Sequence, residues 1–581
     1  MHGGYWPPYI TDWMNFSGPP GSWVVTNCTA YRVWRDVNRA EIWFYDPSVK
    51  RWFLSYVSEL VNVSELFANP YVCDTPEDEL KGIWVPKIMG FRAMEVYKGC
   101  LYAGAGGIAG IFNTSTYQPP LLIRTCNGIN WEEVPTPKEM SYDTRAIEAH
   151  NGWIYVGASV PSEWDILLFP EAEFRKLRSY ALVWGSPGHP NASSDWVLVA
   201  NLTRDEVPSI GNTRAVSLKS FNGYLYVGTS NFLYGFELWR SRVPNPIDPV
   251  NDWIKIIDYG GGDMMNYFAG TMVVYNNTLY VGTMLWPFIV PSNESEKAKP
   301  TLRGFDIFEV YPNDTWDLLV GAYIPRRPVE GWPYDYYVNI TINETNITLP
   351  IRIPRSFYPS GFGNLFNIYA WSMEVYNETF YIGTMDWTTF LYFISIEDIL
   401  RILGYSEENL TQALQILIVE LNETIDYLNE TDLIPDEFVD LLAQIRDKLI
   451  EVVESGNVTQ ALDELKEWFL EYFGGTDLWK TSNGLLWIPV TLNGFNNSYN
   501  YGFRVLAIGP GSSAKLYVGT ANPFFGAQML RAPEEPAPLP PPIVGGSISM
   551  NSSTNTLLLT FLILIIGAMT MIAITRFVKY R

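Results

Sequence analysis

One short pattern recurs along this chain and limits what it can fold into. Its copies are CLYAGAG (100–106), WIYVGAS (153–159), YLYVGTS (224–230), TLYVGTM (278–284), TFYIGTM (379–385) and KLYVGTA (515–521). An alternating apolar run that ends in an Asn or Gly turn precedes the copies, as MEVYKG does before the first. Such a turn between two runs of period-two alternation is typical of a β-hairpin. The pattern therefore predicts a series of antiparallel hairpins.

A second hairpin follows each of the first. Its leading strands read LLIRT (121–125), ALVWG (181–185), ELWRS (237–241), DIFEV (306–310), DLWKT (477–481) and QMLRA (528–532). A tryptophan marks the trailing strands, at Trp131, Trp196, Trp253, Trp316 and Trp487. Units of four strands that repeat about every 50 residues indicate a β-propeller.

The N-terminal region supplies a further unit. AEIWFYDPSVKRWFLSY (40–56) has the pattern of a second hairpin, and the weaker strands 23–27 and 31–35 would complete its blade. We therefore expect an all-β propeller of seven four-stranded blades within residues 1–532, with six blades as the alternative.

Closure of the ring needs one more strand. The last unit has no trailing strand after Met529–Arg531, and DWMNF (12–16) resembles the trailing strand DWIKI (252–256). We expect residues 12–16 to pair there, which would leave no free sheet edge.

The units resemble kelch-like and Asp-box propeller repeats. RTCNGINW (124–131) and KTSNGLLW (480–487) are similar to shortened Asp-box turns, with Asn127 and Asn483 where that family usually has Asp. The resemblance covers about residues 12–532 and implies a fold. It does not imply an activity, because propellers host binding, scaffolding and catalysis alike.

Two insertions interrupt the period. Residues 321–363 are rich in Pro and Tyr, whereas 396–473 carry apolar residues at helical spacing and predict a helical bundle. These insertions and the excursions 160–180 and 285–303 leave from one face of a propeller, where loops carry function.

The C-terminal region predicts an anchor. Residues 533–555 are rich in Pro and Ser and would form a stalk. Residues 556–575 contain no charge and are long enough to span a bilayer as a helix, and the basic tail 576–581 would stay cytoplasmic. The expected location is thus a cell membrane or virion envelope, with a single pass and an extracellular ectodomain.

Composition is consistent with an exported surface protein. With 39 basic and 62 acidic residues the net charge is −23, which disfavours nucleic acid as a partner. Few thermolabile amides suggest a thermophile, and with dense sequons an archaeon or archaeal virus. N-glycosylation is expected at nineteen N-x-[ST] sequons, namely Asn15, Asn27, Asn62, Asn113, Asn191, Asn201, Asn276, Asn293, Asn313, Asn339, Asn343, Asn346, Asn377, Asn409, Asn422, Asn429, Asn457, Asn496 and Asn551.

The four cysteines predict two disulfide bonds outside the cell. Of the three possible pairings we favour Cys100–Cys126, because these residues fall on successive predicted strands, which leaves Cys28–Cys73.

The innermost strands begin with similar tetrads, and arginine recurs in them at Arg92, Arg145, Arg214 and Arg504. Guanidinium groups at a channel mouth would bind a carboxylate, sulfate or phosphate. The alternative, which we prefer, is structural: Glu95, Glu148 and Glu374 lie three residues further on and would pair with arginines of neighbouring blades.

Catalytic motifs are missing from the sequence. The histidines His2, His150 and His189 are scattered, and neither a metal-site nor a nucleophile motif occurs, so no metal and no cofactor are expected. Sialidases place an arginine cluster on a similar propeller, and by that analogy Tyr97, Tyr376 and Glu374 are nominal catalytic candidates.

These observations favour a non-enzymatic, membrane-tethered glycoprotein. Its stalked propeller would bind a protein or glycan partner, or form part of a homo-oligomeric envelope lattice or virion spike. The alternatives are an ectoenzyme acting on glycans and a receptor that captures a solute.

Overall fold

The computed structural model describes residues 14–15, 21–46, 48–76, 79–106, 122–137, 139–140, 144–160, 180–202, 211–285, 288–289, 299–300, 303–342, 345–364, 366–392, 474–509, 514–522 and 524–533, with single positions between 415 and 470. The chain divides into two compact units, Met1–Gly260 and Gly261–Arg581.

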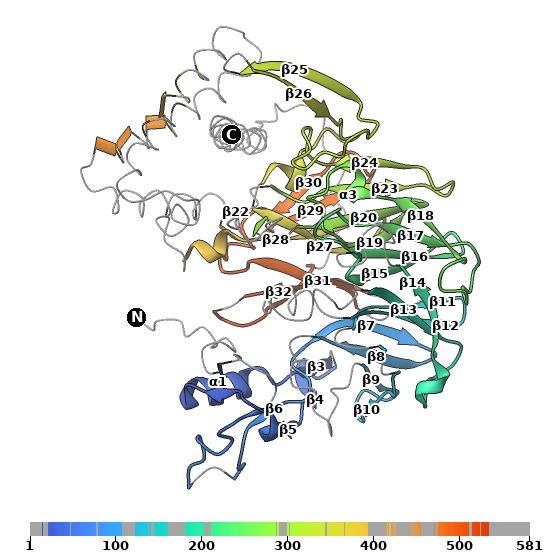
Figure 1. Cartoon of the computed structure of the whole chain (residues 1–581), viewed down its shortest axis with the longest axis vertical. Helices are drawn as coiled ribbons and strands as arrows, with labels where there is room; N and C mark the ends of the chain where they lie inside the picture. The colour runs from blue at the N-terminus through green and yellow to red at the C-terminus, as the bar shows by residue number, and fades with distance from the viewer. Residues whose placement is uncertain are drawn as a thin grey trace. The chain divides into compact units, whose positions relative to one another are not determined.

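The described strands of the first unit that belong to the repeat form three successive groups of four antiparallel strands (Figure 1). The first consists of β7 (Phe91–Tyr97), β8 (Cys100–Ala105), β9 (Leu122–Thr125) and β10 (Glu132–Glu133). The second consists of β11 (Thr144–His150), β12 (Trp153–Val160), β13 (Tyr180–Ser186) and β14 (Val197–Asn201). The third consists of β15 (Arg214–Phe221), β16 (Tyr224–Ser230), β17 (Leu238–Ser241) and β18 (Trp253–Ile257). Strands paired in chain order are the blades that the repeat predicts.

The second unit continues the same pattern. One blade consists of β19 (Phe268–Tyr275), β20 (Thr278–Met284), β23 (Ile307–Val310) and β24 (Trp316–Val320). The next consists of β27 (Asn367–Tyr376), β28 (Thr379–Asp386), β29 (Leu478–Thr481) and β30 (Ile488–Thr491). The last has three strands, β31 (Gly502–Ile508), β32 (Leu516–Ala521) and β33 (Met529–Arg531). A short pair, β21 (Phe288–Ile289) and β22 (Lys299–Pro300), lies between β20 and β23 in the chain. The all-β propeller architecture is therefore confirmed.

The glycine of the repeated motif allows consecutive blades to pack closely. A Cβ atom on Gly157 of β12 would come within 2.8 Å of the carbonyl oxygen of Ala215 on β15. In the second unit, a Cβ atom on Gly383 of β28 would come within 2.7 Å of Phe503 Cβ on β31. Both separations are shorter than real Cβ atoms tolerate, so a side chain would push the blades apart.

The N-terminal segment forms a small α/β structure. Strand β1 (Met14–Asn15) pairs with β2 (Val24–Val25), helix α1 (Cys28–Val37) follows, and β5 (Leu60–Asn62) pairs with β6 (Trp84–Pro86). Apolar side chains from these elements, among them Trp23, Tyr31 and Trp34, make one buried cluster.

The predicted strand at residues 31–35 is wrong, because these residues belong to α1. The side chain of Asn27 accepts a hydrogen bond from Ala30 N at 3.1 Å and caps the helix. Tyr31 and Trp34 are three residues apart and buried, as the inner face of a helix requires. Aromatic residues that read as a strand are thus the buried stripe of a capped helix.

The hairpin predicted at residues 40–56 is confirmed as β3 (Glu41–Asp46) and β4 (Arg51–Val57), which form a two-stranded sheet. The pairing of residues 12–16 with the last blade is wrong. Met14 and Asn15 pair with β2, and β33 pairs with β32 in the part of the chain that the structure describes. The N-terminal segment therefore does not form the four-stranded sheet that a seventh blade needs, and the number of blades stays a prediction.

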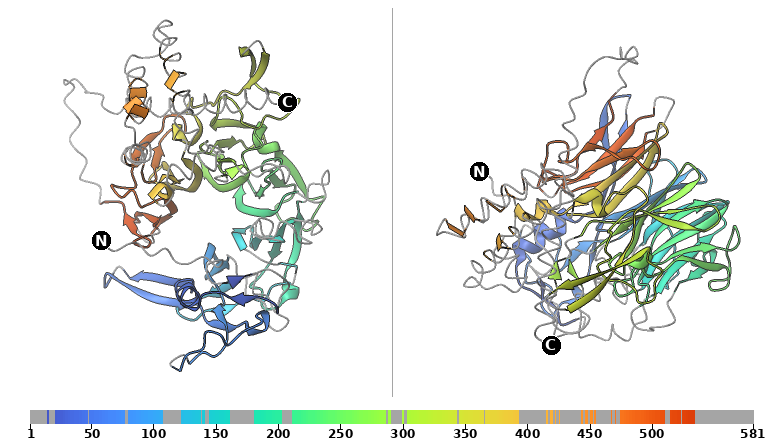
Figure 2. Two further views of the ribbon diagram at one scale, coloured as in Figure 1. Left: turned by 60° about the vertical axis from the view of Figure 1, so that its left-hand side comes forward. Right: turned by 90° about the horizontal axis from the view of Figure 1, so that it is seen from above.

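The insertion at 321–363 contains a long hairpin, β25 (Tyr336–Ile342) and β26 (Thr345–Ile351), which projects away from β24 (Figures 1 and 2). At its base, Arg352 Nη2 lies 3.0 Å from Asp306 Oδ2, and Arg303 contacts the same carboxylate. These groups are buried, so the hairpin is attached to its blade by a desolvated ion-pair cluster.

Most of the predicted helical insertion 396–473 lies outside the described residues, although single positions such as Ile425 and Leu470 are helical and buried. The predicted stalk, membrane span and tail, residues 534–581, also lie outside them. Among the residues that are described, no helix has the length and apolar character needed to cross a bilayer.

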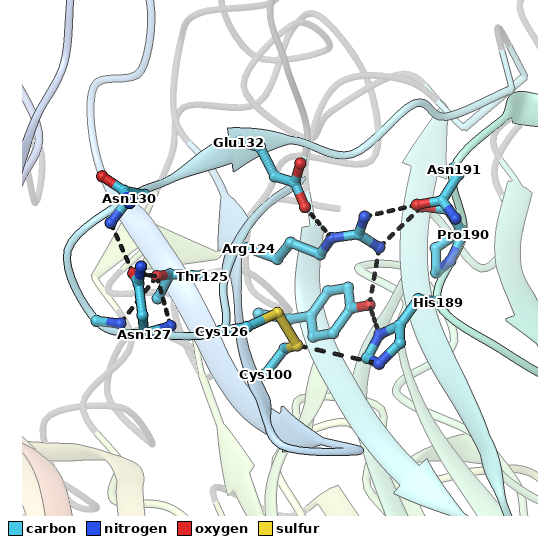
Figure 3. The surroundings of a disulfide bond; sticks show 12 residues. Cys100, Arg124, Thr125, Cys126, Asn127, Asn130, Glu132, His189, Pro190 and Asn191 are labelled. Carbon is cyan, nitrogen blue, oxygen red and sulfur yellow. Dashed lines mark hydrogen bonds and ion pairs between the residues drawn. A yellow bond between two sulfur atoms is a disulfide. The ribbon is translucent and has the colours of Figure 1, made fainter.

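Both predicted disulfide bonds are confirmed. Cys100 and Cys126 join β8 to the turn after β9, with their Cα atoms 4.0 Å apart, and Cys28–Cys73 ties α1 to the segment before β6, with 5.4 Å between Cα atoms. Beside the first bond, the Arg124 guanidinium is held by Glu132 and Asn191, and Tyr102 Oη bonds to His189 Nδ1 at 2.7 Å (Figure 3).

The two Asp-box-like turns have the same hydrogen bonds. Asn127 Oδ1 accepts from Ile129 N at 3.0 Å and from Asn130 N at 2.8 Å (Figure 3), and Asn483 Oδ1 accepts from two backbone groups at the same distances. Gly128 has a φ of 75°, a left-handed conformation that favours glycine. The asparagine therefore fills the structural place of the usual aspartate, as a twofold acceptor.

We predict that Asn127→Ala destabilises the chain by about 1–2 kcal/mol, because two turn N–H groups lose their acceptor. Asn127→Asp should stay close to wild type, because a carboxylate accepts the same two bonds. Chemical unfolding of the full chain measures both, and Asn483→Ala is the matched variant in the second unit. An Asn127→Asp variant as unstable as Asn127→Ala would contradict this account.

Candidate carboxylate site

The innermost strands share a β-bulge, which fixes how they align. One residue is left unpaired at Arg92, Arg145 and Val216 in the first unit, and at Gly270, Trp371 and Arg504 in the second. A bulge re-aims the side chain of the extra residue and is found beside active sites more often than elsewhere.

Three residues beyond the bulge lies a position that we call the slot. It is occupied by Glu95, Glu148 and Lys219 in the first unit, and by Val273, Glu374 and Ala507 in the second. The partner across the hairpin is a tyrosine in every case, at Tyr102, Tyr155, Tyr226, Tyr280, Tyr381 and Tyr517. The innermost strands of three consecutive blades in the first unit thus carry two carboxylates and an ammonium group at the slot.

Glu148 is the central member of this row and is only 8% exposed. Its Oε1 accepts a hydrogen bond from Ser220 N of β15 at 2.9 Å. The same oxygen lies 3.6 Å from the ammonium of Lys219. A backbone N–H and a cation both stabilise the ionised form of a carboxyl group.

Glu95 lies on the other side of Glu148 in a partly buried position. Burial, together with the negative charge of Glu148, raises the pKa of Glu95 to about 7, and the charge of Lys219 opposes this rise. Glu95 therefore retains its proton in a large share of molecules at neutral pH. A carboxyl group with a raised pKa next to a second carboxyl group is an arrangement used for general acid–base chemistry.

His150 stabilises the surroundings of Glu148 through two hydrogen bonds. Its Nε2 lies 2.8 Å from the carbonyl oxygen of Pro244, and its Nδ1 lies 2.7 Å from Ser220 Oγ. Burial lowers the pKa of His150, so the ring is neutral. Because Pro244 O accepts only, Nε2 donates to it and Nδ1 accepts from the Ser220 hydroxyl. The ring thereby fixes the residue whose backbone N–H binds Glu148.

The four predicted arginines do not share one position. Arg92 and Arg145 are bulge residues of the first unit, and Arg504 has the same position in the second, where its guanidinium lies 5.2 Å from the ring centre of Trp371. Arg214 pairs with Ser230, two residues before the bulge of β15, and is fully buried. Whether Arg92, Arg145 and Arg504 bind an anion stays a prediction.

The expected salt ring is wrong for Glu95 and Glu148. The cation that contacts Glu148 is Lys219, and this lysine is also the cation that acts on Glu95. Matching the letters TRA at 144–146 and 213–215 hid Lys219, because the bulge of β15 comes two residues later in that match. The tyrosine of the following strand, Tyr226, is the signal that would have placed Lys219 in the slot.

The nominal sialidase residues have other roles. Tyr97 donates to the carbonyl oxygen of Gly152 at 2.6 Å in the first unit. In the second, Tyr376 donates to Ala514 O at 3.2 Å, and Glu374 Oε1 accepts from Val375 N at 2.9 Å. Both hydroxyls therefore bind backbone rather than a reacting carboxylate.

No group of three or more His, Cys, Asp or Glu side chains suited to a metal occurs among the described residues. Of the sequon asparagines in the described part, Asn15, Asn27, Asn62, Asn191, Asn276, Asn313, Asn377 and Asn496 are exposed. Their glycosylation stays a prediction.

No family model matches the chain, and no curated protein matches it. Among solved structures, an α-L-arabinofuranosidase from Clostridium thermocellum is 14% identical, with 52% of this chain and 83% of that chain covered at a TM-score of 0.24. An α-L-arabinofuranosidase from Lactobacillus brevis is 9% identical, with 66% and 89% covered at a TM-score of 0.25. A β-fructofuranosidase from Bombyx mori is 12% identical, with 44% and 53% covered at a TM-score of 0.23.

These comparisons go against our prediction of a non-enzymatic surface glycoprotein for partner binding or envelope assembly. The three structures are glycosidases, and our preference for a chain without enzymatic activity is corrected to the stated alternative, an enzyme that acts on glycans. TM-scores of 0.23–0.25 carry no argument about activity. The case for an enzyme has to come from the residues of this chain.

We predict opposite shifts in the pKa of Glu95 when its two neighbours are changed. Glu148→Gln removes a negative charge and should lower the pKa from about 7 toward the usual range. Lys219→Met removes a positive charge and should raise it. Titration of the ¹³C-labelled glutamate carboxyl signals measures both shifts, with the Glu95→Gln variant identifying the signal. Equal values in all proteins would show that the three groups do not interact.

Proposed function

We propose that this chain is a glycan-active enzyme of the glycoside hydrolase type, with its acid–base pair at Glu95 and Glu148. The observation that carries the proposal is the proton affinity of Glu95, raised to a pKa of about 7 next to a carboxylate held by Lys219 and Ser220. Both carboxyl groups lie on innermost strands of consecutive blades, where a propeller fold holds side chains rigidly.

The proposed chemistry uses the two carboxyl groups differently. Protonated Glu95 would act as general acid and give its proton to the glycosidic oxygen as the bond to the sugar breaks. Glu148 would act as the ionised partner, either as the nucleophile or as the base that activates water. A glycosidase needs one carboxyl group of each kind, and the environments of these two groups supply that difference.

The surrounding residues have supporting roles in this proposal. Lys219 and the Ser220 N–H favour the charged form of Glu148, and a charged Glu148 in turn keeps the proton on Glu95. The hydrogen bonds of His150 to Ser220 Oγ and Pro244 O hold this support in place. The bulge residues Arg92 and Arg145 are the candidates for binding an acidic substituent of the substrate.

Location and blade number are further parts of the proposal. Two disulfide bonds suit an oxidising, extracellular compartment, and the uncharged run 556–575 suits a membrane anchor. We also propose six blades, because six innermost strands carry the bulge and the slot, whereas the N-terminal segment has a helix in that place.

We predict that Glu95→Gln and Glu148→Gln each reduce kcat/KM for glycoside hydrolysis by on the order of 10²–10⁴-fold, the usual contribution of a general acid or base. Wild-type activity should fall as pH rises above about 7, because Glu95 must be protonated. Release of sugar from a panel of oligosaccharides and aryl glycosides measures both.

Glu374→Gln is the matched control, because Glu374 occupies the slot in the second unit and should leave activity unchanged. Full activity of Glu95→Gln and Glu148→Gln, or a wild-type chain that cleaves none of these substrates, would refute the proposed function.

A further inference from the structure

Four blades share a polar triad, which is buried in three of them, whereas Gln528 of the fourth is exposed. An asparagine at or just before the start of the innermost strand donates to an acidic or amide side chain before the third strand, and a threonine of the second strand accepts from the backbone of that residue. The side-chain pairs are Asn212–Glu237 at 2.5 Å in the first unit, and Asn266–Asp306 at 2.9 Å, Asn367–Asp477 at 2.6 Å and Asn500–Gln528 at 3.1 Å in the second. The threonine oxygens are those of Thr229, Thr283, Thr384 and Thr520.

In three of the four triads, the acidic or amide residue either contacts a cation or carries no charge. Glu237 lies 2.8 Å from the ammonium of Lys255. Asp306 contacts the guanidinium groups of Arg303 and Arg352, which hold its pKa down at about 2. The last blade has Gln528, which carries no charge at all.

The remaining triad, that of Asp477, has a second carboxyl group in place of a cation. Asp477 is 1% exposed, and its charge acts on the fully buried Asp386. Asp386 accepts from Thr388 N at 2.7 Å, from Thr388 Oγ1 at 2.5 Å and from Asn364 Nδ2 at 2.6 Å. None of these partners brings a positive charge.

The other groups that face the pair are neutral as well. Asn367 faces the pair from β27, and Asn364 faces it from the segment before that strand. Thr388 faces the pair from the turn after β28, and Trp479 from β29. The backbone of Tyr501, before β31, accepts from Asp386 N. In the described part of the chain, no ion pair is formed by either aspartate, so two ionised carboxylates here would be desolvated and mutually repulsive.

We propose that Asp386 and Asp477 form a proton-binding site in the blade β27–β30, in which bound protons remove the negative charge that cations neutralise in the two preceding triads. At the equivalent position of the following blade, the uncharged amide of Gln528 has the shape of a protonated carboxyl group and accepts from the equivalent asparagine, Asn500. Burial, and for Asp386 the charge of Asp477, raises the pKa of Asp386 to about 8, and burial raises that of Asp477 to about 7.

The sign of the resulting pH dependence follows from these directions. Both carboxyl groups bind protons more tightly in the folded chain than in the unfolded chain. Their contribution to stability is therefore complete below the unfolded pKa, near 3.8, and is lost as pH rises through about 7–8. The pair should therefore stabilise the second unit in acid and lose that stabilising effect in alkali.

The test is the melting temperature of the full chain between pH 4 and pH 9, for wild type and Asp477→Asn, in the same buffers. Asparagine reproduces the protonated form, so the variant should lose much of the alkaline fall in melting temperature and exceed wild type at pH 9. Glu95 contributes a fall of the same sign in both proteins, so the difference between them isolates the pair.

Asp306→Asn is the matched control at the equivalent position one blade earlier. It should lower the melting temperature at every pH, because Arg303 and Arg352 lose their charge partner. If Asp477→Asn behaves like Asp306→Asn, or has the same pH slope as wild type, the proposal is wrong.

A second readout covers the case in which Asp477→Asn does not fold. Infrared spectra of wild type should show a protonated carboxyl band at pH 6 that is lost above about pH 8, and Asp386→Asn should remove part of it. A wild-type spectrum without that band would overturn the proposal, whatever the variants do. None of these outcomes depends on glycosidase activity.

Discussion

The close approach of one blade to the next is the constraint on which the rest of this structure depends. It occurs at the glycine of the repeated motif, where a Cβ atom would overlap Ala215 O beside Gly157 or Phe503 Cβ beside Gly383. Because the gap admits no side chain, the second strand of one blade sets the position of the innermost strand of the following blade. The bulge, the slot and the buried triads all take their places from that contact.

The sequence predicted the parts of the fold that depend on local chemistry. Hairpins follow from alternation and turn residues, and the disulfide Cys100–Cys126 follows from two strands that are neighbours in the chain. The turn at Asn127 could be predicted as well, because its hydrogen bonds stay within a few residues. Features of this kind need no knowledge of distant contacts.

Features that depend on register or on distant partners were not predictable in the same way. Residues 31–35 read as a strand because aromatic residues favour strands, and only the cap at Asn27 and the buried faces of Tyr31 and Trp34 distinguish a helix. Lys219 was missed because the bulge of β15 lies two residues later than the match of the letters TRA places it. The partnership of Asp386 with Asp477 joins residues separated by a whole insertion, and no spacing reveals it.

The acid–base pair was not predictable from the sequence for a related reason. A search for motifs finds nothing catalytic, because Glu95 and Glu148 belong to different repeats and each looks like an ordinary repeat residue. Their chemistry arises from adjacency between blades, because burial and the charge of Glu148 on the neighbouring blade raise the pKa of Glu95. In a repeat fold, the departure of one copy from its neighbours is more informative than the consensus.

The slot shows how such a departure arises without cost to the framework. The same backbone position holds Glu148, Lys219, Val273 and Ala507 in different blades, and the tyrosine across the hairpin is kept each time. A single codon change there can therefore invert or erase a local electric field while the hydrogen-bonded ladder stays as it is. Substitutions at this position can therefore change the local chemistry one blade at a time, in evolution or in design, without altering the strand pairing.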